Sequence, residues 1–594
     1  MLGLGHVFSS RRRCINVDTL LRRQCKFGSI RLSSTAPVSI PVAHSSVNRV
    51  TPRATSFSRW YADVISAADL VDAETPVKGC AILRPRGFAL WAGIQRDLDA
   101  RINSLGAQGV YFPLLVPVSF LSREATHIAG FASEVAVVTH SRLAADPSGV
   151  LGPDPRAKLS EPLVVRPTSE ALVWDAFSRW VRSSRDLPLV INQWANVVRW
   201  ERRTRPFLRT TEFLWQEGHT AHADEDGART FADAAVATYA AHARDALALA
   251  PVLGEKSASE RFAGARRTRT AEAILANGWA LQAATVHELG TEFSSAFGVS
   301  YLRPNGERAL PWGTSWGAST RLVGAVALTH SDDTGLVLPP AIAPEQIVII
   351  ALAGNKSKGS GGAAEVIEAA RRLAVSLRSL SSPQGSSLRV AVDDDVAASP
   401  GGRFYEWERR GVPLRLELGP RELASGMISV SDRVGALRGS RGRALGLPAA
   451  DSRGRLSLSI TDVPELAASL RKALDAVHAE LLARAEILRD DTIIEDATYP
   501  QFLASARATS GGSSQSGADV DDTGGDGVIG DGARASAFLL PWTDDAAAEA
   551  RLRAETRYTL RCFPDDAQSR LRENHVCFMT GRPATHMALF ARAF

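Results

Sequence analysis

The sequence predicts a chain of mixed structure, in which an α+β domain built on an antiparallel sheet is followed by an α/β domain. The first observation is a pair of apolar, β-branched segments at residues 188–198 and 211–215 that flank a basic loop. This arrangement is typical of a long-looped antiparallel hairpin. The second observation is that short apolar segments alternate with amphipathic helical segments from Glu345 onward, which is the pattern of an α/β domain.

The other elements are expected from apolar spacing, which repeats near 3.6 residues in helices and 2 residues in strands. In the first half of the chain they are a helix at 88–105, a proline-interrupted strand at 109–117, a strand at 163–165 that leads into a helix, an alanine-rich helix at 224–250, a strand at 281–290, and a segment at 313–321 that opens an apolar helix. In the second half they are strands at 347–352, 388–392 and 414–418, and helices at 363–379 and 463–489.

Length and composition indicate a multidomain globular protein without a membrane span. A chain of 594 residues is long enough for several domains, each with its own core. Hydrophobic residues make up 45% and charged residues 22%, and no apolar run approaches the ~20 residues needed to cross a bilayer. The five cysteines are too few and too scattered for a disulfide scaffold, which favours a reducing compartment.

The amino-terminal segment differs from the rest of the chain. The first 60 residues hold ten arginines and lysines against one acid, Asp18, with many serines and no secretory-type apolar core. This composition predicts a disordered organellar transit peptide over residues 1–56, and the alternative is a basic tail that binds RNA. The first 60 residues carry a net charge of +9 and the whole chain carries +5, so the remaining residues carry −4. Any nucleic-acid contact of that remainder must therefore come from local basic patches.

The hairpin carries the most informative chemistry. Its loop is rich in arginine, and clustered guanidinium groups favour phosphate or carboxylate because the planar fork donates hydrogen bonds in pairs. The alternative is a solvated basic loop that binds nothing. Arg199 and Glu201 alternate on one strand face with Phe213 and Trp215 nearby. Such a mixture of charge and aromatic surface favours an anion site.

Three further segments each have a functional and a purely structural interpretation. Thr168 and Glu170 lie in a PTSE sequence at a helix start, where they bind a ligand or simply cap free backbone donors. Gln282, Thr285 and His287 are expected on one side of a strand, although a lone histidine is more often a core residue. Arg321 opens a buried helix, and a buried arginine is costly unless an anion pairs with it.

These segments resemble one known family when they are taken together. RWE at 199–201, the basic loop and FLRTTEFLWQEGHTAHA at 207–223 resemble motif 2 of class II aminoacyl-tRNA synthetases, and specifically the prolyl-tRNA synthetases of the eukaryote/archaeal type, including the plant organellar form. GTSWGASTR at 313–321 resembles motif 3, and the helix followed by a strand with Pro113 resembles the dimer-forming motif 1. WERRGVPLRLELGPRE at 407–422 resembles the anticodon-binding domain of class IIa synthetases.

The resemblance implies a domain order and an activity. It implies a class II catalytic domain at 57–340, with an antiparallel sheet and flanking helices, an α/β anticodon-binding domain at 341–455, and a small α+β carboxy-terminal domain at 456–594 with a disordered insertion at 509–535. The implied activity is proline–tRNA ligase: ATP and Mg²⁺ activate L-proline to prolyl-adenylate, which is transferred to tRNA(Pro). A homodimer in the mitochondrial matrix is expected, with the plastid as the alternative.

The resemblance also implies the site residues. Arg199 and Arg321 are the implied catalytic groups. The implied proline-binding residues are Thr168, Glu170, Arg199, Trp215, Glu217, His219, Phe262 and His287. The implied ATP-binding residues are Arg199, Glu201, Arg209, Phe213, Gln282, Thr285, Thr320 and Arg321. The implied anticodon-binding residues are Arg410, Glu417 and Arg421.

The sequence departs from the family pattern at several positions. Only Cys562 and Cys577 stand where archaeal relatives carry a four-cysteine zinc site, so no structural metal is expected. The chain ends in Phe594 where the family usually ends in tyrosine. Two rival functions remain. One is a non-catalytic scaffold that binds tRNA, and the buried arginines count against it because such a protein has no need of them. The other is a class IIa ligase for another amino acid, such as threonine or glycine. A threonine ligase is expected to use a zinc, and residues 168–290 contain no obvious ligand set for one.

Overall fold

The computed structural model describes residues 49–72, 74–123, 134–352, 361–381, 386–438, 440–508 and 535–594. The predicted transit peptide up to residue 48 and residues 509–534 of the predicted insertion at 509–535 lie outside this range, whereas Ala535 is described and buried. Residues 49–56 were expected to be disordered, but they are ordered. Val50 is buried, and the backbone N–H of Thr51 donates a hydrogen bond to Asp63 at 2.9 Å. No helix within the described ranges is long and apolar enough to cross a membrane.

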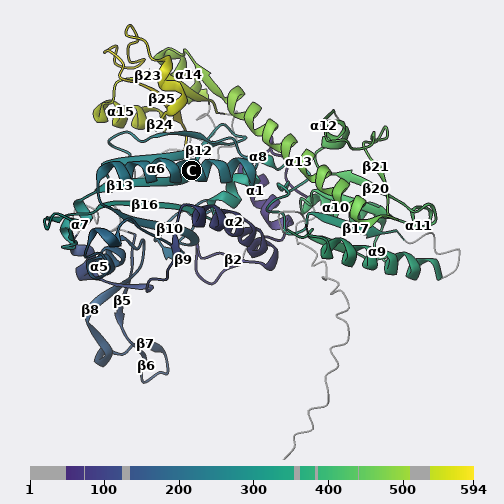
Figure 1. Ribbon diagram of the computed structural model, residues 1–594, viewed down its shortest axis with the longest axis horizontal. Coiled ribbons are helices and arrows are strands. Elements are labelled where there is room, and N and C mark those ends of the chain that lie inside the picture. The colour runs from purple at the N-terminus through teal and green to yellow at the C-terminus, as the bar shows by residue number, and fades with distance from the viewer. Residues whose placement is uncertain are drawn as a thin grey trace, which may run out of the picture. The chain divides into compact units, whose positions relative to one another are not determined.

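An 11-stranded sheet with strands from Gln108 to Ala591 organises most of the chain outside the α/β part (Figure 1). Its spatial order is β22-β23-β25-β24-β11-β12-β13-β16-β10-β9-β3, and its neighbours are antiparallel except for β22–β23 and β3–β9. The strands are β3 (Gln108–Gly109), β9 (Leu189–Val198), β10 (Glu212–His222), β11 (Val252–Glu255), β12 (Arg267–Ile274), β13 (Ala280–Gly290), β16 (Trp312–Ser319), β22 (Ile493–Glu495), β23 (Ala537–Trp542), β24 (Thr559–Pro564) and β25 (His586–Ala591).

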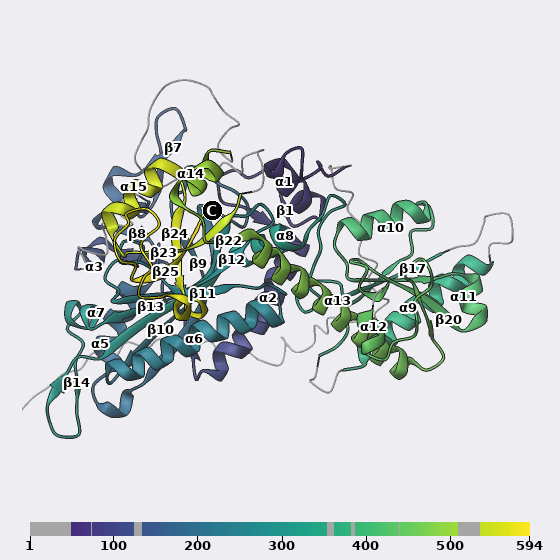
Figure 2. The ribbon, with the colours of Figure 1, turned by 90° about the horizontal axis from the view of Figure 1, so that it is seen from above.

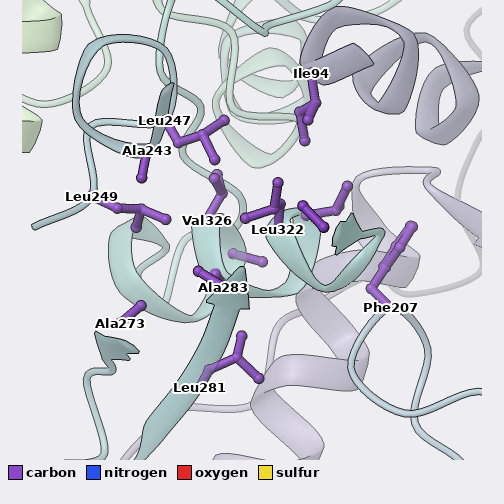
Figure 3. Packing of buried hydrophobic residues seen from close by; sticks show 14 of the residues in the cluster. Ile94, Phe207, Ala243, Leu247, Leu249, Ala273, Leu281, Ala283, Leu322 and Val326 are labelled. Carbon is purple, nitrogen blue, oxygen red and sulfur yellow. The ribbon is translucent and has the colours of Figure 1, made fainter. Parts of the chain in front are cut away.

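Helices pack on this sheet and enclose the largest core. They are α1 (Phe57–Ala67), α2 (Pro85–Ser104), α6 (Glu225–Asp245) and α8 (Arg321–His330), and α2 lies beside α6 (Figure 2). The Asp224 side chain caps α6 by accepting from the backbone N–H of Gly227. Leu281 and Ala283 of β13 pack in the same core as Leu322 and Val326 of α8 (Figure 3). The opposite faces of β13 and β16 remain available for a ligand.

A separate three-stranded sheet of order β4-β8-β5 is made of β4 (Leu115–Pro117), β5 (Ala136–His140) and β8 (Lys158–Val165). A second, smaller core includes Ile191 of β9, Ala221 of β10 and Leu289 of β13. Helices α5 (Glu170–Trp180) and α7 (Glu292–Ala296) supply Trp174, Phe177 and Phe293 to this core. The minor elements of the region are β1 (Val71–Asp72), β2 (Ile82–Leu83), α3 (Val118–Ser122), β6 (Leu143–Ala145), β7 (Leu151–Pro153), β14 (Tyr301–Leu302) and β15 (Arg308–Ala309).

The α/β part contains a five-stranded sheet of order β18-β17-β19-β20-β21, in which β17 pairs in parallel with β18 and β19. Its strands are β17 (Ile347–Ala351), β18 (Val390–Asp393), β19 (Leu414–Leu418), β20 (Met427–Asp432) and β21 (Leu456–Ser459). Its helices are α9 (Gly361–Ser379), α10 (Pro400–Arg409), α11 (Pro420–Ser425), α12 (Ser440–Ala444) and the long α13 (Val463–Thr492). β17 is buried along its whole length, as expected for a central parallel strand.

The carboxy-terminal module comprises β22, α14 (Tyr499–Ala508), β23, α15 (Ala546–Thr556), β24 and β25 around an aromatic core that includes Phe502 and Trp542. Its strands continue the catalytic sheet, because Gly254 and Glu255 of β11 pair with Pro564 and Phe563 of β24. A side chain at Gly254 would meet the Phe563 carbonyl oxygen at 2.4 Å, so this strand pairing requires glycine.

The structure corrects three sequence-based expectations about the elements. The strand expected to end at Trp215 continues to His222, because β9 and β16 pair with it on both sides. The strand expected over 109–117 is two short strands, β3 and β4, in different sheets. The domain boundary expected after residue 455 falls too early, because β21 pairs with β20 and α13 as far as Leu481 packs in the α/β core.

Candidate active site

A cavity of about 570 Å³ lies on the open face of the central sheet. Its walls come from the β9–β10 hairpin, β13, β16, the start of α8 and the carboxy-terminal module. All of the residues that the sequence implied for proline and for ATP line it: Thr168, Glu170, Arg199, Glu201, Arg209, Phe213, Trp215, Glu217, His219, Phe262, Gln282, Thr285, His287, Thr320 and Arg321. The fold therefore brings together residues that are up to 153 positions apart in the chain.

One corner of the cavity is built from buried carboxylates. Glu170 is the first residue of α5, and the Thr168 hydroxyl donates a hydrogen bond to it. Glu217 and His219 lie two residues apart on β10 and so project from the same face. Glu170, Glu217 and His219 are each less than 5% exposed. Buried carboxylates favour a cationic ligand, because an opposite charge offsets the cost of burying a negative one.

The Glu217 carboxylate is held in place by neighbouring side chains. Its Oε1 accepts hydrogen bonds from the Ser169 hydroxyl at 2.5 Å and from the Gln193 amide, and its Oε2 lies 3.4 Å from His219 Nε2. Gln193 lies opposite Glu217 in the β9–β10 register. Burial by itself would lower the pKa of His219, but Glu217 and Glu170 outweigh it, so this pKa is raised above its usual value.

Three buried polar atoms near this corner have no hydrogen-bond partner among the described residues. They are His219 Nδ1, Trp215 Nε1 and Ser315 Oγ, and all three residues line the cavity. A buried donor without a partner costs about 1–3 kcal/mol. Their clustering in one cavity indicates a polar ligand that satisfies them when it is bound.

Arg199 lies between the carboxylate corner and the rest of the cavity. It follows β9 directly, and its backbone N–H donates to the Thr211 carbonyl at 2.8 Å. Its Nε donates to the Pro167 carbonyl at 3.1 Å, and its guanidinium lies 5.4 Å from the Trp215 ring centroid. Burial lowers the pKa of Arg199, while Glu170, Glu134 and Glu217 oppose that shift. These contacts orient the guanidinium fork towards the cavity.

The hairpin loop supplies a second guanidinium. Arg209 Nε donates to the Glu201 carboxylate, whose other oxygen accepts from the backbone N–H of Arg203 at 2.9 Å. Phe213, at the start of β10, lies edge-on to Trp215 with ring centroids 6.0 Å apart. One face of the loop therefore offers an aromatic surface beside a charged pair, which suits a flat polar ring next to phosphates.

Arg321 supplies the third guanidinium, at the first turn of α8. Its Nε donates to the Leu208 carbonyl at 2.9 Å, and Thr320 precedes it at the helix N-cap. Burial, together with charge repulsion from Arg199, Arg209 and Arg561, lowers the pKa of Arg321 to about 10. The guanidinium groups around Arg321 repel it, and a bound polyanion offsets that repulsion. The arrangement therefore fits a triphosphate.

The strand β13 contributes Gln282, Thr285 and His287 to the cavity wall. An odd separation such as 282 to 285 would put two side chains on opposite faces of a regular strand. A β-bulge opposite Ala271 and Glu272 leaves Ala283 unpaired and restores Gln282 and Thr285 to one face. His287 stacks on Phe262, with ring centroids 4.4 Å apart, and its Nδ1 lies 3.0 Å from Thr268 Oγ1.

Comparisons with known proteins decide the family. Residues 156–330 match the class II tRNA synthetase core domain (G, H, P, S and T), residues 346–446 an anticodon binding domain, and residues 533–594 the prolyl-tRNA synthetase C-terminal domain. A proline–tRNA ligase of Porphyromonas gingivalis is 40% identical over 550 residues, which are 92% of this chain and 99% of that protein.

The chain belongs to the prolyl-tRNA synthetase family.

Other relatives span the same length. A proline–tRNA ligase of Roseiflexus castenholzii is 40% identical over 546 residues, covering 92% of this chain and 99% of that protein. A proline–tRNA ligase of Arabidopsis thaliana, named chloroplastic/mitochondrial, is 39% identical over 545 residues, covering 92% of this chain and 88% of that protein. The predicted fold is confirmed: a class II catalytic domain, an anticodon-binding domain and the carboxy-terminal domain follow in order.

The three candidate anticodon residues lie in the α/β domain of this synthetase, away from the cavity lining. Arg410 is buried, donates to Glu406 at 2.9 Å and lies over the Trp407 ring. Glu417 is also buried and accepts from Arg415 at 3.1 Å. Arg421, on α11, is exposed. Of the three candidates, Arg421 is therefore the one whose side chain is presented to solvent.

No group of three or more His, Cys, Asp or Glu side chains that could hold a metal ion occurs in the described part of the chain. Cys562 and Cys577 are both buried, but they pack in different apolar clusters. The expectation that this synthetase lacks a structural metal stays a prediction.

Sequence reasoning missed several residues that complete the site. Ser169 and Gln193 hold Glu217, although Ser169 lies within the PTSE segment and Gln193 at an inward position of a predicted strand. Ser315 lies within the segment that resembles motif 3. The carboxy-terminal wall, which includes Arg561 and Phe594, gave no local signal, because pairings between distant segments bring it to the cavity. β24 pairs with β11, and Ala593 forms a bridge with Ala280.

Proposed function

We propose that this chain activates L-proline with ATP and transfers the prolyl group to tRNA(Pro). The proline carboxylate attacks the α-phosphorus of ATP, pyrophosphate leaves, and a terminal ribose hydroxyl of the tRNA then displaces AMP. Both steps depend on positioning and charge stabilisation more than on a protein nucleophile. The observation that carries the proposal is the position of Arg199, between a carboxylate corner and an arginine-lined wall in one cavity.

The carboxylate corner is assigned to proline. Thr168 and Glu170 accept hydrogen bonds from the protonated secondary amine of proline, because a buried carboxylate offsets its positive charge. Glu217 and His219 shape the other side, together with Trp215, Phe262 and His287. The arginine fork of Arg199 then meets the proline carboxylate and the α-phosphate where negative charge builds during attack.

The arginine wall is assigned to ATP. Phe213 stacks on the adenine ring, and Glu201 with its adjoining backbone accepts from the adenine amino group. Arg209 and Arg321 hold the outer phosphates. The position of Arg321 supports this assignment, because its burial and the repulsion from neighbouring arginines favour a bound anion beside it. Gln282, Thr285 and Thr320 complete the nucleotide site.

Mg²⁺ fits this wall as a companion of the triphosphate. Gln282 and Thr285 offer neutral oxygen donors to the cavity, and Mg²⁺ is commonly held by a few protein oxygens together with substrate phosphates. When bound, the ion would offset phosphate charge.

ATP–pyrophosphate exchange with each of the twenty amino acids tests the proposed function. We expect proline to support exchange well above the others. A chain that exchanges with no amino acid would be a tRNA-binding scaffold, and exchange with threonine or glycine would identify a ligase of another specificity. Prolylation of tRNA(Pro) by the same preparation tests the second step.

We propose that the α/β domain reads the guanine bases of the proline anticodon. The match of residues 346–446 to an anticodon binding domain supports this, and exposed single-stranded bases are what RNA-binding proteins read specifically. Arginine pairs with guanine O6 and N7, so the exposed Arg421 is the first candidate. Replacing either guanine should lower prolylation about tenfold to 100-fold, at about 1–3 kcal/mol per base contact, and leave exchange unchanged. Equal charging of substituted and native tRNA would remove the assignment.

We propose that the basic amino terminus directs the chain to the mitochondrial matrix, with the plastid as the alternative. The arginine-rich, acid-poor composition of residues 1–56 supports a transit peptide, and one relative is named chloroplastic/mitochondrial. A fusion of residues 1–60 to a fluorescent protein should colocalise with a mitochondrial marker. The same fusion with its arginines changed to glutamine should remain in the cytosol. Cytosolic retention of the unchanged fusion would contradict the proposal.

We propose that the enzyme is a homodimer that pairs through the region resembling motif 1. Tyr111 is 75% exposed, and Leu114 and Leu115 are also exposed, an apolar surface that a second copy would cover. Light scattering of the purified protein should give twice the monomer mass. The Tyr111→Asp variant should shift that mass towards the monomer.

A further inference from the structure

The carboxy-terminal module reaches the cavity through one buried ion-pair cluster. Glu272 of β12 is fully buried, and its Oε2 accepts from Nε and one terminal nitrogen of Arg561 on β24, at 3.1 and 2.9 Å. Its Oε1 accepts from Lys256 Nζ at 2.9 Å. Burial by itself would raise the pKa of Glu272, but the two cations hold it at about 2, so the carboxylate is ionised throughout the physiological range.

The same carboxylate is linked to the proposed nucleotide wall. The Thr270 hydroxyl donates to Glu272 Oε1 at 2.9 Å, and the Gln282 amide Nε2 donates to the Thr270 oxygen at 3.3 Å. The Thr270 hydroxyl has two acceptors within reach, Glu272 Oε1 at 2.9 Å and the Ala284 carbonyl oxygen at 3.4 Å, and the nearer, ionised carboxylate takes its single proton. The Thr270 oxygen is then left to accept from Gln282. The side-chain amide of Gln282 is thereby oriented, with its carbonyl oxygen left as an acceptor.

We propose that Arg561 is a positioning residue for the nucleotide, acting through Glu272 and Thr270 on Gln282. The inference rests on the proposed function, because it takes Gln282 as part of the ATP site. The carboxy-terminal module then does more than extend the sheet: it fixes which face of an amide meets the nucleotide. Arg561 also lies in the cavity wall and adds to the positive field at Arg321.

The geometry offers a matched control for docking of the module alone. Asp565, which directly follows β24, pairs with Arg269 of β12 at 2.5 Å, and so ties the carboxy-terminal module to the same strand without a contact to Gln282. A loss of module docking should appear in Asp565→Asn as well as in Arg561→Met. A loss of Gln282 orientation should appear in Arg561→Met alone.

A double-mutant cycle on the full-length enzyme tests the proposal. Arg561→Met should raise the KM for ATP in exchange about tenfold, a coupling of about 1.4 kcal/mol, within the range for residues in one hydrogen-bond network. The KM for proline should change less than about twofold. In the Gln282→Ala background, Arg561→Met should add little, because the group it orients is already absent. Asp565→Asn should leave the KM for ATP unchanged relative to its parent, both in the wild-type and in the Gln282→Ala background.

Three controls keep the outcome decisive. Arg561→Lys retains the charge and should recover part of the ATP affinity, and it serves if the methionine variant does not fold. Thermal unfolding of every variant separates loss of fold from loss of position. ATP affinity measured by calorimetry does not require proline activation, so it distinguishes failure of this coupling from failure of the proposed function. Equal effects of Arg561→Met in the presence and absence of Gln282, or a matching defect in Asp565→Asn, would overturn the proposal.

Discussion

Replacing Arg199 with alanine is expected to reduce proline-dependent ATP–pyrophosphate exchange by about 100-fold to 1000-fold. In the proposed site the change removes a preorganised bidentate donor from the place assigned to the reacting carboxylate and α-phosphate, and loss of one such donor typically costs about 3–4 kcal/mol. The fold should survive, because the Arg199 backbone N–H keeps its bond to Thr211. Steady-state exchange rates and the melting temperature of the variant measure the two effects.

The neighbouring loop provides the control for this experiment. Arg202 is exposed in the same hairpin loop and does not line the cavity. Arg202→Ala removes the same charge from the same loop, so its exchange rate should stay within about threefold of wild type. Near-normal exchange in Arg199→Ala would show that Arg199 does not act at the reacting centre. The assignment of the carboxylate corner to proline and of the arginine wall to ATP would then fall as well.

Replacing Glu170 with glutamine is expected to raise the KM for proline by about tenfold to 100-fold. The substitution keeps the shape of the side chain but removes the negative charge that faces the protonated amine of proline in the proposed site. Hydrogen bonds to charged groups contribute about 1.5–3 kcal/mol. Glu170 is buried and accepts a hydrogen bond from Thr168, so bulk water cannot solvate the proline amine in place of the lost carboxylate. The KM for ATP should change little, because the arginine wall is untouched.

An exposed glutamate on β10 provides the comparison for Glu170. Glu212 lies on β10 but is exposed and outside the cavity lining. Glu212→Gln should leave both Michaelis constants within about twofold of wild type. If Glu170→Gln raises the KM for ATP instead of that for proline, the carboxylate corner belongs to the nucleotide and the two assignments must be exchanged.

Local chemistry explains which elements could be predicted from sequence. The hairpin was predictable because β-branched segments and a proline-containing basic loop specify two strands and a turn within 30 residues. The central parallel strand β17 was predictable because burial on both faces demands a continuous apolar run, and β19 because leucine alternates with Arg415 and Glu417. The end of β10 was not, because Glu217 and His219 look like strand breakers until β9 and β16 cover both edges and β10 carries them into the cavity.

The site divides in the same way. Sequence alone determined the chemical content of the cavity, since the arginines, carboxylates and aromatics of the hairpin and the start of α8 are read directly from their segments. Only the tertiary structure decided how they are used: a bulge at Ala283 puts Gln282 and Thr285 on one face, and buried partners remove Arg410 and Glu417 from solvent. It also brought Arg561 to Glu272 across 288 intervening residues. Such contacts depend on strand pairing between distant segments, which leaves no periodic signal in either segment.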